Sequence, residues 1–131
     1  DSFIGNVLRG EDIVLFSDGS PTRTFCYVAD AVIGYFKVLV AGTNGQAYNI
    51  GVETPEISIR NLAERLISIS EDLLGYRGKL VMAASADKDY LVDNPNRRCP
   101  DLRKARSELG YKPEITLDDG LKRSLIWCAH Q

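Results

Sequence analysis

A turn followed by an arginine is the first group of residues whose types suggest a chemistry. Residues 17–21 read Ser-Asp-Gly-Ser-Pro, a strongly turn-forming composition, and Arg23 follows two residues later. Free backbone N–H groups in a turn bind phosphate, and a guanidinium forms paired hydrogen bonds to phosphate oxygens. The spacing predicts a diphosphate-binding site at Arg23. The alternative is that Arg23 forms a surface ion pair with Asp18 or Asp30.

A second group lies in a polar stretch of the C-terminal half. Residues 93–101 read Asp-Asn-Pro-Asn-Arg-Arg-Cys-Pro-Asp. Arg97 and Arg98 suit an anion, and Asp93 suits the hydroxyl groups of a ribose or another sugar. The alternative is a solvated charge cluster that caps the following helix, and for Asp101 we favour that role.

Helices that position these groups are indicated by capping residues and apolar spacing. The apolar run over residues 31–41, with Asp30 as N-cap, predicts a helix buried in the core. After Ser58, another good N-cap, apolar residues recur at helical spacing: Ile59, Leu62, Ala63, Leu66, Ile67 and Leu74. Further helices are expected over residues 2–9 with Gly10 as C-terminal cap, from Asp101 to Gly110, and after Thr116, where Leu117, Leu121, Leu125 and Cys128 share a face.

Short β-rich runs cover residues 12–16, 47–51 and 79–83, and the polar stretch 84–99 is expected to be a long loop. The second run ends in Tyr-Asn-Ile-Gly, where Asn49 more often satisfies a nearby backbone group than a ligand. Several helices and a few short strands cannot build a doubly wound sheet. The pattern therefore predicts a small α+β unit, with residues 1–131 as one domain.

Composition excludes several classes of function. The chain has 131 residues, 44% of them hydrophobic and 26% charged, and a net charge of −2, so no nucleic-acid footprint is indicated. The longest apolar stretch, residues 31–41, contains Lys37 and is too short to cross a bilayer, so no membrane partner is expected. The sequence begins at Asp1 rather than a methionine, and we expect it to be part of a longer protein.

Cysteine and histidine usage argues against metal and nucleophile chemistry. The three cysteines, Cys26, Cys99 and Cys128, are odd in number and form no C-x-x-C pair. A disulfide framework or zinc site is therefore not expected, and a reducing cytoplasm is the expected location. The single histidine, His130, is next to the last residue, where a Ser-His-Asp or Cys-His mechanism would depend on a fraying terminus.

Taken in order, these segments resemble the C-terminal half of the extended short-chain dehydrogenase/reductases that act on nucleotide sugars, the NAD-dependent epimerase/dehydratase family. The family pattern is a β-rich run, a G-x-G-like turn, an arginine, an aromatic, Y-V-x-D, Y-N-I-G, an arginine-containing loop, K-A-x-x-x-L-G-W/Y-x-P and G-L. This sequence matches it at Leu15-Phe16, Asp18-Gly19, Arg23, Phe25, Tyr27-Val28, Asp30, Tyr48-Asn-Ile-Gly51, Lys104-Ala105, Leu109-Gly-Tyr111, Pro113 and Gly120-Leu121. One departure is Pro21, which stands where relatives often have Gln.

The resemblance implies a role for particular residues. Arg23 and Arg98 are implied to contact the nucleotide diphosphate, with Arg97 in place of Arg98 if the register differs by one. The loop containing Leu15 and Phe16 is implied to pack on the base. The ligand is implied to be a UDP- or dTDP-sugar, and the intact enzyme to be an NAD-dependent homodimer. Residues 93–106 look closest to the UDP-glucuronate decarboxylases, which carry a D-P-x-x-R-x-P-D-x-x-K-A-like run.

The chemistry of that family needs two motifs that these 131 residues lack. No G-x-x-G-x-x-G run is present to place backbone N–H groups on a dinucleotide pyrophosphate. None of the six tyrosines is followed four positions later by the lysine that would lower its pKa. We therefore expect no catalytic, cofactor-binding or metal-binding residue here, and expect the NAD site and the acid–base residues to lie on a separate Rossmann domain.

Two alternatives to a decarboxylase remain at this point. Within the same family, the intact protein could be a sugar-nucleotide 4-epimerase or 4,6-dehydratase. In another class, the chain could be a non-catalytic binding or self-association module. Without a Rossmann domain it should expose apolar surface, and such patches drive association.

Overall fold

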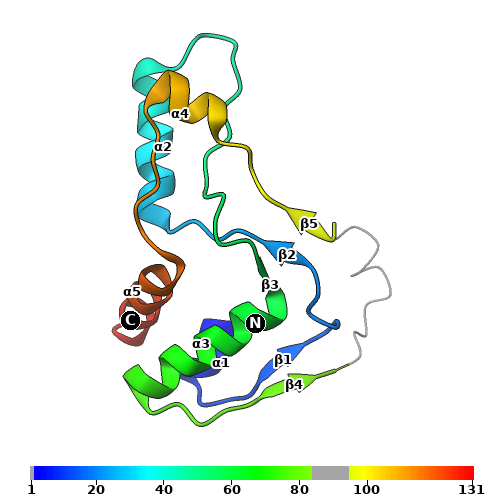
Figure 1. Cartoon of the computed structure of the whole chain (residues 1–131). Helices are drawn as coiled ribbons and strands as arrows, with labels where there is room; N and C mark the ends of the chain where they lie inside the picture. Colours follow the sequence, from blue (N-terminus) through cyan, green and yellow to red (C-terminus); the bar gives the residue numbers. More distant parts are fainter. Residues whose placement is uncertain (1, 84–94) are drawn as a thin grey trace.

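The computed structural model of the chain confirms the α+β expectation, and it describes residues 2–83 and 95–131. The helices are α1 (Phe3–Leu8), α2 (Val28–Ala41), α3 (Ile59–Leu74), α4 (Arg103–Leu109) and α5 (Leu117–Ala129). The strands are β1 (Ile13–Leu15), β2 (Thr22–Arg23), β3 (Ile57–Ser58), β4 (Leu80–Met82) and β5 (Arg97–Arg98). Figure 1 shows α2 and α4 at one end, α1, α3 and α5 with β1 and β4 at the other, and the remaining strands between them.

The larger core lies where α1, α3 and α5 pack together beside the parallel pair of β1 and β4. Helix α3 begins after Ser58, whose side chain accepts the Asn61 N–H, and ends at Gly75 in the left-handed conformation. Its apolar stripe faces this core, although Leu74 in the last turn is 45% exposed. The buried members of the core are Val7, Ile13, Leu15, Ala63, Leu66, Ile69, Tyr76 and Leu125.

A smaller core joins α2 to α4. Its buried residues are Leu102, Ala105, Leu109 and Tyr111, with Val38, Tyr48 and Ile50 packed against them. Helix α2 can approach this closely because residue 34 is glycine, where a Cβ would collide with Ile50 and Tyr111. The left-handed Gly110 ends α4 as predicted.

Asp30 connects the two ends of the molecule, but not as the helix cap that the sequence suggested. Helix α2 begins at Val28, so Asp30 lies inside its first turn, and the residue at the N-cap position is Tyr27. Asp30 is only 4% exposed, and its carboxylate accepts the backbone N–H groups of Glu114 (3.1 Å) and Ile115 (2.8 Å). These two bonds attach the start of α2 to the segment between α4 and α5.

The prediction that α2 is buried is wrong. Among its residues only Asp30 and Gly34 are buried. Seven apolar side chains of the helix are exposed: Val28, Val32, Ile33, Tyr35, Phe36, Leu39 and Val40. A helix that is apolar all round needs cover on more than one side, and in the described residues α4 packs against only one.

The strand predicted at residues 47–51 is also wrong, because no strand is assigned there and the segment packs between α2 and α4. Its polar groups bond to α4 and the residues before it: the Tyr48 hydroxyl to the Glu108 carboxylate (2.6 Å) and the Asn49 amide to the Asp101 carbonyl (3.1 Å). The predicted long loop instead contains β5, since β2 offers it a backbone partner. Strand formation here follows the availability of a partner rather than local propensity.

Replacing Asp30 tests the connection between the two ends. Asp30→Ala leaves two backbone N–H groups without their acceptor, so we expect the free energy of unfolding to fall by about 2 kcal/mol. Urea denaturation at 25 °C followed by circular dichroism measures this, with the exposed Asp72→Ala on α3 as the matched control. A loss for Asp30→Ala no larger than that for Asp72→Ala would contradict the connecting role.

Candidate functional site

The sheet between the two ends of the molecule borders an open cavity of about 610 Å³. Strands β2 and β5 contribute arginines to its wall. The rest of the wall comes from the residues after β2, from residues 50–52 and from the start of the segment after β5. The lining residues are Arg23, Thr24, Cys26, Ile50, Gly51, Val52, Arg97, Arg98, Cys99 and Pro100.

The register of two parallel strands brings Arg23 and Arg98 together. In the three-stranded sheet of order β3-β2-β5, Arg23 lies directly opposite Arg98, and Thr22 lies opposite Arg97. Neighbouring strands are about 4.8 Å apart, and residues in register project from the same face. Arg23 and Arg98 therefore leave the sheet side by side on one face, next to the cavity. Arg98 is exposed and Arg23 half-buried.

Arg97 also lines the cavity, but its guanidinium is bound by the Glu56 carboxylate. Its guanidinium donates Nε–H to Glu56 Oε1 and Nη2–H to Glu56 Oε2, both at 2.8 Å. The Thr22 hydroxyl donates to the same carboxylate at 2.6 Å. Hydrogen bonds from Arg97 and then from Thr22 hold the pKa of Glu56 below its usual value, and Glu56 raises the pKa of Arg97. Of the two adjacent arginines, Arg97 is therefore the one whose guanidinium is bound by a carboxylate.

The turn before β2 does not offer the free donors that its sequence suggested. The Gly19 N–H bonds to the Ser17 hydroxyl (3.2 Å), and the Ser20 N–H bonds to the Asp18 carboxylate (2.9 Å). The Ser20 hydroxyl donates to the same carboxylate at 2.7 Å, and the two bonds from Ser20 lower the pKa of Asp18. Gly19 has a φ of +72°, and a Cβ there would lie 2.8 Å from the Arg60 Cβ. The turn therefore serves to pack β1 and β2 against the start of α3.

The other sequence candidates have different outcomes. Leu15 is 3% exposed and belongs to the larger core, so its side chain is not at the cavity. Phe16 is 50% exposed but does not line the cavity. Asp93 lies outside the described residues. The N-cap position of α4 is Leu102 rather than Asp101, although the Asp101 carboxylate still accepts the Arg103 N–H at 3.0 Å. Hydrogen bonds from Arg103 lower the pKa of Asp101 to about 2.

Tyr111, which sequence reasoning missed, supports the opposite wall of the cavity. Its buried hydroxyl donates to the Gly51 carbonyl at 2.9 Å, and Gly51 packs against Pro100, whose ring would be 3.2 Å from an added Cβ. Burial raises the pKa of Tyr111. The apolar spacing around Leu109-Gly-Tyr111 could have indicated a buried tyrosine, but its partner Gly51 is distant in sequence.

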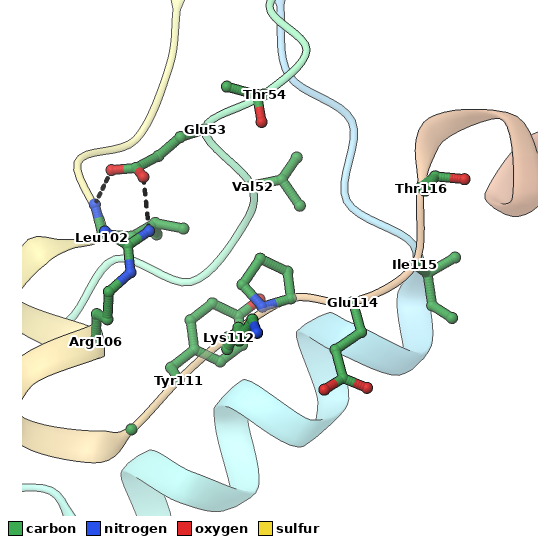
Figure 2. Close-up of a pocket in the computed structure, with 12 residues that line it drawn as sticks. Val52, Glu53, Thr54, Leu102, Arg106, Tyr111, Lys112, Glu114, Ile115 and Thr116 are labelled. Carbon is green, nitrogen blue, oxygen red and sulfur yellow. Dashed lines mark hydrogen bonds and ion pairs between the residues drawn. The ribbon is translucent and has the colours of Figure 1, made fainter.

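A second cavity of about 600 Å³ lies between α4 and the segment that leads to α5, as Figure 2 shows. Of its two acidic lining residues, Glu53 and Glu114, the first is bound by two donors of the protein. Glu53 accepts the Leu102 N–H (3.0 Å) and an Arg106 N–H (2.8 Å), which together lower its pKa. Glu53 therefore caps the start of α4, and this cavity presents no comparable pair of cationic side chains on one sheet face.

Two kinds of site are absent from the described part of the chain. Within residues 2–83 and 95–131, no group of three or more His, Cys, Asp or Glu side chains is placed to hold a metal ion. None of the helices in those same two ranges is both long and apolar enough to cross a membrane. All three cysteines are free thiols.

Comparisons with known proteins agree on one family. Residues 1–51 match the NAD dependent epimerase/dehydratase family. Over 95% of its length the chain is 30% identical to UDP-N-acetyl-alpha-D-glucosaminuronate decarboxylase of Bacillus cytotoxicus and 34% identical to UDP-glucuronic acid decarboxylase 1 of Xenopus tropicalis. Among solved structures it matches UDP-glucuronic acid 4-epimerase of Bacillus cereus, in complex with UDP-glucuronic acid and NAD, with a TM-score of 0.78 and 27% identity over 98% of the chain.

The chain is much shorter than these relatives. It covers 38% of the Bacillus cytotoxicus protein, 27% of the Xenopus protein and 38% of the Bacillus cereus structure. The matched region is their C-terminal part.

The thiol of Cys26 gives a pH test of the cavity wall. Burial raises the pKa of Cys26 above its ordinary value, and the nearby Asp30 charge adds to this. A raised pKa leaves less thiolate at neutral pH, so we expect slower alkylation by iodoacetamide than for a free cysteine at pH 7.5, with a midpoint at higher pH. Mass spectrometry of the Cys26 peptide between pH 7 and 10 measures both. A midpoint at or below that of the free amino acid would contradict this wall geometry.

Proposed function

Because the chain belongs to the NAD dependent epimerase/dehydratase family, we propose that its arginine-lined cavity binds the diphosphate of a sugar nucleotide. The observation that carries the proposal is the register that sets Arg23 beside Arg98 on one sheet face. Like charges directly opposite one another in a sheet repel, and an anion bound between them removes that repulsion. A diphosphate offers oxygens to both guanidinia at once.

The ligand class follows from the same family. The Bacillus cereus relative is in complex with UDP-glucuronic acid and NAD. We propose a UDP- or dTDP-sugar for this chain, and favour a decarboxylase over a 4-epimerase or 4,6-dehydratase because the relatives reported above include two decarboxylases. Phe16, half exposed after β1, remains our proposed contact for the base, and Asp93 for a sugar hydroxyl.

The reaction itself is proposed to belong to another part of a longer protein. NAD supplies the uptake and return of a hydride, and these 131 residues carry neither the glycine motif nor the Tyr-x-x-x-Lys pair for that step. Arg23 and Arg98 contribute binding energy at the nucleotide, remote from the reacting sugar. That energy orients the sugar for hydride transfer. We accordingly propose that the chain by itself is inactive, and place it in the cytoplasm on account of its free thiols.

The exposed face of α2 is proposed to pack against the nucleotide-binding part of a longer protein. This face consists of the seven exposed apolar side chains of α2. Of the two charged residues in the helix, Asp30 is buried and Lys37 directs its amine to the Leu109 carbonyl. The chain covers only 38% and 27% of two relatives, and their remaining length gives such a part a source. Self-association through the same face is the alternative.

Nucleotide titration tests the binding site. We expect saturable UDP binding by the folded chain, weakened at least tenfold by Arg23→Ala and by Arg98→Ala, because each removes a charge-assisted contact worth about 1.5–3 kcal/mol. Isothermal titration calorimetry measures this. Arg65→Ala is the matched control, since Arg65 is an exposed arginine on α3 that pairs with Asp118. Equal affinities for Arg98→Ala and Arg65→Ala, or no binding by a folded wild type at millimolar UDP, would contradict the proposal.

The α2 face gives a second test. The dye 8-anilinonaphthalene-1-sulfonate should fluoresce on this chain, and Leu39→Lys should reduce that signal because Leu39 is 79% exposed on the apolar face. The control is Leu73→Lys on α3, where the leucine is 42% exposed. In a longer protein that also includes the residues encoded upstream in the same gene, we expect weaker dye fluorescence and slower amide exchange in α2. Unchanged fluorescence and exchange in that product would favour self-association instead.

A further inference from the structure

Glu56 lies where the three short strands of the central sheet meet. It directly precedes β3, and its carboxylate binds one residue from each of the other two strands. Thr22 of β2 donates its hydroxyl at 2.6 Å, and Arg97 of β5 donates two N–H groups at 2.8 Å. One side chain therefore joins all three strands through polar contacts.

These contacts all lie on the sheet face opposite Arg23 and Arg98. Successive residues of a strand alternate between faces, and residues in register share one. Thr22 and Arg97 are in register, as are Arg23 and Arg98. On β3, Ile57 is in register with Arg23, so its neighbour Glu56 projects toward the face of Thr22 and Arg97. The ion pair of Glu56 thus occupies one face, and the two remaining arginines occupy the other.

The register of β5 needs such a contact. The strand has only two residues, and these are two identical side chains, Arg97 and Arg98. A slip by one residue moves every side chain to the other face, and nothing in an Arg-Arg pair itself opposes it. The backbone adds one bond beside the pair, from the Thr22 N–H to the Asn96 carbonyl at 2.8 Å. Glu56 supplies the side-chain contact that distinguishes the first arginine from the second.

We propose that Glu56 is a positioning residue for the diphosphate site, which holds Arg97 and Thr22 on one face so that Arg98 faces the cavity beside Arg23. This rests on the proposed function, in that Arg98 is the ligand-facing arginine. Glu56 itself does not line the cavity and need not touch the ligand.

Removing the charge of Glu56 tests this proposal, because electrostatic attraction and the register contact predict opposite changes in UDP affinity. Glu56→Gln removes a negative charge near an anion site, so simple electrostatic attraction predicts equal or tighter UDP binding. Loss of the register contact predicts weaker binding, and we expect at least a fivefold increase in Kd by calorimetry. The matched control is Glu64→Gln, an exposed glutamate of α3 with the same change in net charge, which we expect to leave Kd within twofold.

Two further variants separate positioning from a general loss of structure. Thr22→Val removes only the hydroxyl bond to Glu56 and changes no charge, and we expect a twofold to threefold increase in Kd even if Glu56→Gln fails to fold. In the double variant Glu56→Gln with Arg98→Ala, Kd should equal that of Arg98→Ala alone, because Glu56 acts through Arg98. A merely destabilising change would add to the loss.

The outcomes distinguish the two proposals. If the folded wild type does not bind UDP, the proposed function fails and this inference fails with it. If the wild type binds and Arg98→Ala weakens it, but Glu56→Gln leaves Kd unchanged or lowers it, only the positioning role is overturned. Amide exchange at Thr22, measured by NMR, gives a readout without nucleotide: it should be faster in Glu56→Gln than in Glu64→Gln, and equal rates would overturn the register role.

Discussion

The parallel pairing of β2 with β5 is the contact on which the candidate site depends. Two strands of two residues each set Thr22 opposite Arg97 and Arg23 opposite Arg98. All three arginines line the cavity, but the register sets Arg97 on the face where it pairs with Glu56 and sets Arg23 and Arg98 on the other. A short strand gains little from its own backbone bonds, so neighbouring contacts must hold it. Here β3, Glu56 and the close approach of Gly19 to Arg60 provide them.

The rest of the fold holds the two sides of this cavity. The larger core supports α3, whose N-terminus follows β3 directly. The smaller core holds Tyr111, which bonds to the Gly51 carbonyl in the opposite wall. Asp30 then links the start of α2 to residues 114 and 115, so the larger and smaller cores are joined by part-buried polar bonds as well as by the sheet. The apolar face of α2 remains uncovered by the described residues.

The sequence predicted well those features that depend on residues close to one another in the chain, such as helix caps and helix ends. Ser58 and Thr116 cap α3 and α5 through bonds to residues three positions on, and Gly75 and Gly110 end helices in the left-handed conformation. The failures depend on distant partners. Residues 47–51 have strand composition but no strand beside them, and α2 has core composition but no complete cover. The two arginine segments were identified from residue type, and the resemblance already placed Arg98 ahead of Arg97. The ion pair of Arg97 with Glu56 could not be read from the sequence, because its two residues are 41 positions apart.

The most direct measurement is the affinity of the wild type, Arg23→Ala, Arg98→Ala and the double variant for UDP and for UMP. If the two arginines together hold a diphosphate, each single change weakens UDP binding much more than UMP binding. The double variant then loses less than the product of the two single losses, since the side chains share one ligand group. Equal losses for UDP and UMP, or fully independent effects of the two arginines on UDP, would contradict the account.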